Sequence, residues 1–132
     1  MTRYLLDTNT VSYLIKGNAT VARRLVDTPM VSLCISSVTE GELRFGLAKR
    51  PHAKRLHILV REFLLRIDVL SWESTTAEHY GTMRALLEQK GRTLAPLDML
   101  IAAHALAVDA VLVTNDQSFG RVPDLRVEDW TK

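Results

Sequence analysis

The chain has 132 residues, of which 47% are hydrophobic and 24% are charged. We expect a single domain spanning residues 1–132, since this length fits one core and the composition excludes a disordered or low-complexity chain. Lys and Arg number 17 against 15 Asp and Glu, which gives a formal net charge of +2. That balance neither indicates nor excludes a nucleic-acid partner, because the distribution of charge matters more than its sum.

The only cysteine, Cys34, excludes an intramolecular disulfide and a cysteine-ligated metal cluster. No apolar run approaches the length of about 18 residues that spans a membrane. The N-terminal apolar run, Tyr4–Leu6, is too short for a secretory signal and is followed at once by Asp7. We therefore expect a cytoplasmic protein without a membrane partner.

Strand and helix signals alternate along the chain. Short apolar runs predict strands at residues 4–6, 31–35, 68–70, 110–114 and 125–127. Apolar residues at helical spacing predict helices at 11–16, 19–27, from 37 onward, 54–67, 75–90 and 96–106. Capping-box spacings accompany two of these helices, Ser37 with Glu40 and Thr75 with Glu78. The clearest strands are apolar without alternation, which predicts an α/β fold, a three-layer α/β/α domain with a central, mostly parallel sheet.

Three carboxylates follow predicted strands. Asp7 comes directly after the first strand, Glu42 lies in the first turns of the helix after the second, and Asp116 follows the strand that ends at Thr114. Because ligands bind at the carboxyl ends of the strands of a parallel sheet, we expect all three at one edge. Asp98 is the only charge in the apolar stretch 94–103, and its position near the start of a helix places it at the same edge.

Four converging carboxylates without a matched Lys or Arg would repel one another. A divalent cation removes that penalty, and oxygen ligands without His or Cys suit Mg²⁺ or Mn²⁺. Such an ion can clamp phosphate oxygens and activate water, so the pattern predicts metal-assisted hydrolysis of a phosphodiester. The predicted catalytic residues are Asp7, Glu42, Asp98 and Asp116, with Asp7, Asp98 and Asp116 as metal ligands. Neighbouring side chains expected to support them are Thr8, Asn9, Ser37, Thr114 and Asn115.

Each acid also has an ordinary structural interpretation. Asp7 and Asp116 could be turn residues, and Asp98 could serve only to favour its helix dipole. Glu42 stands three residues after Thr39, at capping-box spacing. A shared edge of one sheet accounts for all four residues, whereas these local interpretations account for them only one at a time.

Five segments that contain these acids resemble a known family when taken in order. They are Leu5–Asn9, Ile35–Gly46, Pro96–Ala105, Leu112–Asp116 and Val122–Trp130. Together they resemble the PIN-domain ribonucleases and, within them, the VapC toxins of bacterial toxin–antitoxin pairs. One departure is Asp124, at a turn where relatives often carry glycine.

The resemblance implies a Mg²⁺- or Mn²⁺-dependent endoribonuclease toxin that is dimeric and is inhibited by a VapB-type antitoxin. Asp7, Glu42, Asp98 and Asp116 would form its acidic tetrad, with Thr114 beside it. The resemblance also suggests tRNA as the substrate, cut in the anticodon loop to inhibit translation, with initiator tRNA among the candidates. Operator DNA, bound through the antitoxin, is a further implied partner.

Two basic segments, at 44–55 and 90–92, are candidate contacts for RNA phosphates. Their cationic residues are Arg44, Lys49, Arg50, Lys54, Arg55, Lys90 and Arg92. A solvated surface and an antitoxin contact are the alternatives for both segments. The helices at 11–27 and 54–67 could also leave an apolar groove for a partner helix.

Two other functions compete with the nuclease. Asp7–Val11 superficially matches an aspartyl-phosphatase motif, but Asn9 stands where that motif places its general acid. The second alternative is a catalytically inactive PIN-like fold that serves as a scaffold for RNA or protein. The intact set of four acids favours the nuclease over both.

Overall fold

A five-stranded, all-parallel sheet runs through the middle of the computed structural model, which describes residues 1–132. The strand order is β3-β2-β1-β4-β5. The strands are β1 (Tyr4–Leu6), β2 (Leu33–Ser36), β3 (Asp68–Leu70), β4 (Val111–Val113) and β5 (Val127–Glu128). β1 lies at the centre, with Leu5 paired to Cys34 on one side and to Leu112 on the other. The predicted parallel sheet is thus confirmed.

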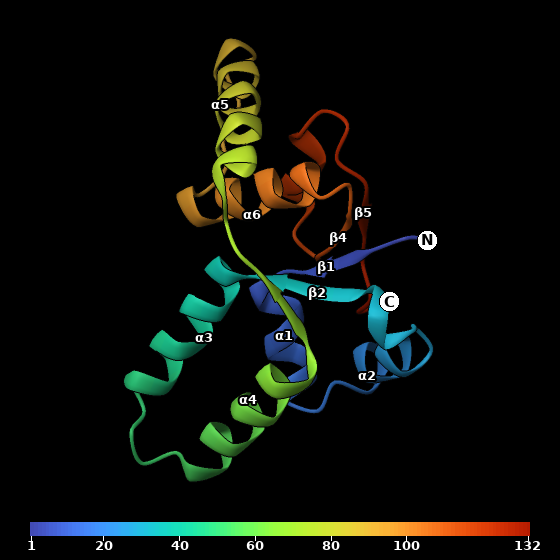
Figure 1. Cartoon of the computed structure of the whole chain (residues 1–132), viewed down its shortest axis with the longest axis vertical. Helices are drawn as coiled ribbons and strands as arrows, with labels where there is room; N and C mark the ends of the chain where they lie inside the picture. Colours follow the sequence, from blue (N-terminus) through green and yellow to red (C-terminus); the bar gives the residue numbers. More distant parts are fainter.

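Helices cover both faces of this sheet (Figure 1). One face carries α1 (Thr8–Ile15), α2 (Ala19–Val26), α3 (Ser37–Ala48) and α4 (Lys54–Arg66), and the other carries α5 (Ser74–Gln89) and α6 (Pro96–Ala107). Alternate strand residues point into the two cores. Leu5 and Leu112 pack with α5 and α6, whereas Leu6 and Val113 pack with α1 to α4. Burial on both faces explains why these strands are continuously apolar.

Several helix starts differ from the predicted capping boxes. Ser36, rather than Ser37, caps α3 by accepting a hydrogen bond from the backbone N–H of Val38 at 3.1 Å. Glu40 forms an ion pair with Arg44. Helix α5 begins after Glu73 without any side-chain cap, so the predicted box of Thr75 with Glu78 is also wrong. The spacing of a capping box is short and common, and the path of the chain into the helix decides which residue caps it.

Other element boundaries shift by a few residues. Asp7 caps α1 and accepts from the backbone N–H of Thr10, so this helix begins at Thr8 instead of residue 11. Residues Met30–Ser32 form a short 3-10 helix where the second strand was expected to begin. Gly91 ends α5 as predicted, with a φ of 65° and the backbone N–H of Arg92 bonded to the carbonyl of Leu87 at 2.8 Å.

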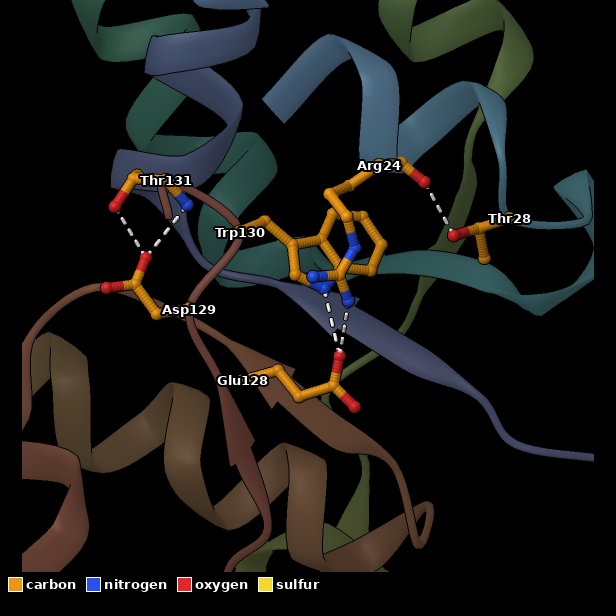
Figure 2. Close-up of polar contacts among 6 residues, drawn as sticks. All are labelled: Arg24, Thr28, Glu128, Asp129, Trp130 and Thr131. Atoms are coloured by element: carbon orange, nitrogen blue, oxygen red, sulfur yellow. Dashed lines mark hydrogen bonds and ion pairs between the residues drawn. The ribbon is translucent and has the colours of Figure 1, made fainter. Parts of the chain in front are cut away.

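The C-terminal residues return to α2 (Figure 2). Glu128 accepts hydrogen bonds from Arg24 and from the indole N–H of Trp130, both at 3.0 Å. The Trp130 side chain is only 1% exposed and lies 5.5 Å from the ring of Tyr4, between centroids. This C-terminal corner fixes the edge strand β5 to the core of the α1–α4 face. No helix of the structure is both long enough and apolar enough to cross a membrane.

Candidate active site at the carboxyl edge of the sheet

Asp7 lies where β1 passes into α1 and is only 4% exposed. Its carboxylate accepts a hydrogen bond from the backbone N–H of Thr10 at 2.8 Å. Burial raises the pKa of Asp7, hydrogen bonds from Thr114 and Thr10 lower it, and the nearby charge of Asp116 raises it further. The partners of this buried carboxylate are therefore neutral donors.

Glu42 reaches the same edge from α3. Its Oε1 accepts a hydrogen bond from the hydroxyl of Thr8 at 2.6 Å, and the Thr8 hydroxyl lies 3.2 Å from that of Thr39. These contacts join residues more than 30 positions apart in the chain. The local alternative, in which Glu42 caps its own helix together with Thr39, is wrong, since Ser36 is the cap.

Asp98 stands in the first turn of α6 and is half-buried. Its pKa is raised first by burial and then by the negative charges of Asp116, Asp7 and Glu42. No side-chain hydrogen bond or ion pair compensates its charge. The core of α6 is fully buried as the sequence predicts, but Asp98 itself lies at its partly exposed end.

Asp116 follows β4 in the loop and opens a short 3-10 helix, Gln117–Arg121. Its carboxylate accepts from the backbone N–H of Ser118 at 2.9 Å, which lowers its pKa. Its own backbone N–H donates to the hydroxyl of Thr114 at 3.0 Å. Asp116 is therefore an ordinary turn residue in its local bonding. It is also a member of the acidic group, because its charge raises the pKa of both Asp7 and Asp98.

The acidic edge, defined as Asp7, Glu42, Asp98 and Asp116, contains no Lys or Arg in an ion pair with any of the four. All five ion pairs of the structure lie elsewhere. A set of uncompensated carboxylate oxygens has the donor chemistry that Mg²⁺ and Mn²⁺ prefer. No three acidic, His or Cys side chains are arranged closely enough here to ligate one ion. Mg²⁺ usually takes only one or two carboxylates directly and completes its shell with water and phosphate oxygens, so the residues present fit such an ion.

The predicted supporting residues divide into two groups. Thr8 and Thr114 contact the acids, as predicted. Asn9 is exposed, Ser37 accepts from the backbone N–H of Trp72, and Asn115 donates to the hydroxyl of Tyr13, so none of these three contacts the acids. Ser37 and Asn115 have the right sequence positions, but their side chains bond to other neighbours.

Two hydroxyl residues of the site were missed from the sequence. Thr10 is 2% exposed and donates to the carbonyl of Val113 at 3.0 Å, which ties the start of α1 to β4 beside Asp7. Thr39 is fully buried beside Thr8. The sequence does place a threonine close after each of the two strand ends, but helix capping is the ordinary interpretation of a threonine at such a position.

The predicted basic contacts lie at different distances from the acidic edge. Lys49 and Arg50, at the end of α3, line the same hollow as Thr8 and Glu42. Arg44 is held in an ion pair by Glu40, with 2.8 Å between nitrogen and oxygen. The remaining cations are exposed, at the start of α4 and after α5, namely Lys54, Arg55, Lys90 and Arg92.

Comparison with known proteins agrees with this geometry. The PIN-domain family model matches residues 4–125. The chain is 38% identical to the tRNA(fMet)-specific endonuclease VapC of Shigella flexneri, over 99% of this chain and all of the relative. The chain belongs to the VapC ribonucleases of the PIN-domain family. Ribonuclease VapC2 of Rickettsia felis is 33% identical, over 98% of each chain.

Solved structures of VapC proteins share the fold over almost the whole chain. A DNA-bound VapBC from Salmonella typhimurium superposes with a TM-score of 0.91 at 37% identity, covering 98% of this chain and 99% of that one. VapBC2 from Rickettsia felis, bound to a promoter DNA fragment, superposes with a TM-score of 0.90 at 33% identity, with the same coverage. The expected VapC resemblance and the expected α/β fold are thereby confirmed.

Proposed function

We propose that the chain is a divalent-metal-dependent endoribonuclease, the toxin of a toxin–antitoxin pair, and that it hydrolyses RNA phosphodiester bonds. The observation that carries the proposal is the acidic edge, where four carboxylates from distant segments lie near enough for their charges to raise the pKa of Asp98, and none of them forms an ion pair. Membership of the VapC ribonucleases supplies the reaction class. A purely structural role does not explain why the chain would retain such a repulsive arrangement.

The acids have different roles in this proposal. Asp7, Asp98 and Asp116 would hold Mg²⁺ or Mn²⁺, either directly or through water, and direct ligation of one ion by all three would require their side chains to move closer together. The bound ion would clamp phosphate oxygens and lower the pKa of water. Glu42 presents one oxygen to Thr8, which fixes its orientation and leaves Oε2 free to accept a proton from the attacking water. Thr10 and Thr114 hold the carboxylate of Asp7 in place.

The substrate and the partners follow from the relatives. Two relatives, from Shigella flexneri and Salmonella typhimurium, are named tRNA(fMet)-specific endonucleases, so we infer that initiator tRNA is the first substrate to test. Structural neighbours are VapBC complexes, two of them bound to DNA, which supports a VapB-type antitoxin that could link the toxin to operator DNA. An apolar hollow between α2 and α4, lined by Leu25, Leu33 and Phe63, suits an antitoxin helix. We further propose that the toxin is a homodimer.

Cleavage of RNA by the purified chain is the direct test. With Mg²⁺ or Mn²⁺ the parent should cut tRNA, and a chelator should abolish the cutting. Asp7→Asn and Asp98→Asn should lower the rate by roughly a thousandfold, because each removes a charge that holds the ion. Asp109→Asn is a matched control, since Asp109 is exposed and pairs with Arg126. The proposal is wrong if the Asp7 and Asp98 variants cut like the control.

Thermal unfolding tests the metal site without relying on activity. A divalent ion that binds only the folded chain should stabilise it by about 2.7 kcal/mol at a concentration a hundred times its Kd. The Asp98→Asn variant should lose this stabilisation, whereas Asp109→Asn should keep it. If neither ion stabilises the parent and no RNA is cut, the inactive scaffold becomes the better assignment.

A further inference from the structure

A hollow of about 200 Å³ leads away from the acidic edge between α1, α3 and α4. Thr8 and Glu42 line one end of it, and Lys16, Lys49 and Arg50 line the other. Glu42 and Lys49 are seven residues apart on α3, which is about 10 Å at the helical rise.

Gly46 lies in the floor of this hollow, halfway between Glu42 and Lys49 on α3. A glycine inside a helix destabilises it relative to alanine. Gly41 on the same helix and Gly81 on α5 also have open space at the Cβ position, but Gly46 is the helical glycine that lines the hollow. No heavy atom lies within 4 Å of the position that a Cβ would take, and its φ is not positive. Nothing within the chain requires a glycine there. What the missing side chain provides is open space inside the hollow.

The cations at the far end of the hollow have no carboxylate partners. Lys16, Lys49 and Arg50 form no ion pair in the structure. The ammonium of Lys49 lies 4.7 Å from the centroid of the exposed Phe45 ring, which is not part of the hollow's lining, and this contact leaves the charge of Lys49 unneutralised. Arg44, on the same helix, is neutralised by Glu40 and does not line the hollow.

We propose that this hollow is the path of the RNA strand beside the scissile phosphate, with Gly46 leaving room for the strand and Lys49 and Arg50 each binding a backbone phosphate farther along it. The inference rests on the proposed ribonuclease function and adds to it a path for the substrate. Continuity of the hollow with Thr8 and Glu42 connects the path to the acidic edge.

The charge of the hollow favours RNA over a protein segment. Its far rim carries three unpaired cations, which suits a polyanion. The hollow between α2 and α4 has a different character, since five of its seven lining residues are hydrophobic and its two charged residues, Glu62 and Arg66, pair with each other. That second hollow is the better match for an apolar peptide.

Measuring RNA binding in a protein that cannot cut RNA tests this inference separately from the cleavage proposal. All variants carry Asp98→Asn, and the fluorescence anisotropy of a labelled single-stranded RNA gives Kd as a function of salt. Lys49→Gln with Arg50→Gln should weaken binding several-fold. It should also reduce the slope of log K against log salt by about 1.4, at about 0.7 per lost phosphate contact. Arg44→Gln, which removes a cation already paired, should change both quantities much less.

A second pair of variants tests the open floor. Gly46→Gln should fill the hollow and weaken RNA binding about tenfold, whereas Gly46→Ala should bind as the background does. Thermal unfolding should show that both fold, since the added Cβ meets no neighbour. The inference is overturned if the Gly46→Gln and Lys49→Gln/Arg50→Gln proteins bind RNA like the background. It is also overturned if the Gly46→Gln protein keeps the RNA affinity of the background and loses only its binding to the antitoxin. If these losses appear but the parent with Asp98 intact cuts no RNA, the path stands and the ribonuclease proposal fails.

Discussion

The acidic edge follows β1, β2 and β4, and the C-terminal corner follows the edge strand β5 beside them, yet the carboxylates of the two regions have different environments. Glu128 is paired with Arg24 and accepts from the indole of Trp130, while the neighbouring Asp129 accepts two bonds from Thr131 (Figure 2). The hydrogen bonds from Thr131 lower the pKa of Asp129. Asp98, in contrast, has no such partner, and burial together with like charges raises its pKa.

This difference shows that the chain can compensate its carboxylates where stability alone is at stake. At the acidic edge none of the four carboxylates forms an ion pair, and Asp98 has no hydrogen-bond donor either, which costs stability and keeps its oxygens available. Such an arrangement makes sense where a cation from solution completes the site. The C-terminal corner gives a comparison within the same molecule, because its carboxylates have hydrogen-bond donors or a paired cation and no metal site is proposed there.

The largest expected effect comes from a substitution that disrupts the C-terminal corner. Trp130→Ala should lower the free energy of unfolding by about 3–5 kcal/mol, because a fully buried indole is lost. Trp130→Phe should cost less, since it keeps most of the packing and removes chiefly the hydrogen bond to Glu128. Urea unfolding measures both. Equal losses in the two variants would mean that the hydrogen bond, and not the packing, holds the corner.

Removing one charge from each region should have effects of opposite sign. In metal-free buffer Glu128→Gln should destabilise the chain by about 1 kcal/mol or less, because its ion pair with Arg24 is partly exposed. Asp98→Asn should stabilise it by a similar amount, about 1 kcal/mol at most, because it relieves repulsion and desolvation. Glu78→Gln, at an exposed and unpaired residue, is the neutral control. A loss of stability in Asp98→Asn would remove the contrast between the two regions.

The smallest effect lies in the loop that joins the two regions. Asp124 has a φ of 66°, in the left-handed region that favours glycine. Asp124→Gly should therefore stabilise the chain by about 0.5–1 kcal/mol, and Asp124→Ala should destabilise it. Denaturant midpoints would show the order. If glycine proved the less stable residue, a contact of the aspartate side chain would outweigh its backbone strain.

Much of the architecture was predictable from local patterns. Unbroken apolar strands such as Val111–Val113 indicated burial on both faces, and the alternation of strands and helices indicated a parallel sheet. The four acids were predictable because the carboxyl ends of parallel strands share an edge. Capping was less predictable, since Ser36 and Ser37 are adjacent and only the approach of His104 to Ser36, at 2.7 Å, and of Trp72 to Ser37 separates their roles.

The sequence by itself determined which segments are strands and that the sheet is parallel, and it predicted four acids at one edge, because periodicity and strand-end position are local properties of the chain. Only the tertiary structure decided which neighbours complete the site. Thr10 bonds to Asp7 and Thr39 contacts Thr8, the partner of Glu42, whereas Asn115 bonds to Tyr13. Side-chain direction at a junction depends on packing between distant elements, and so does the open floor at Gly46.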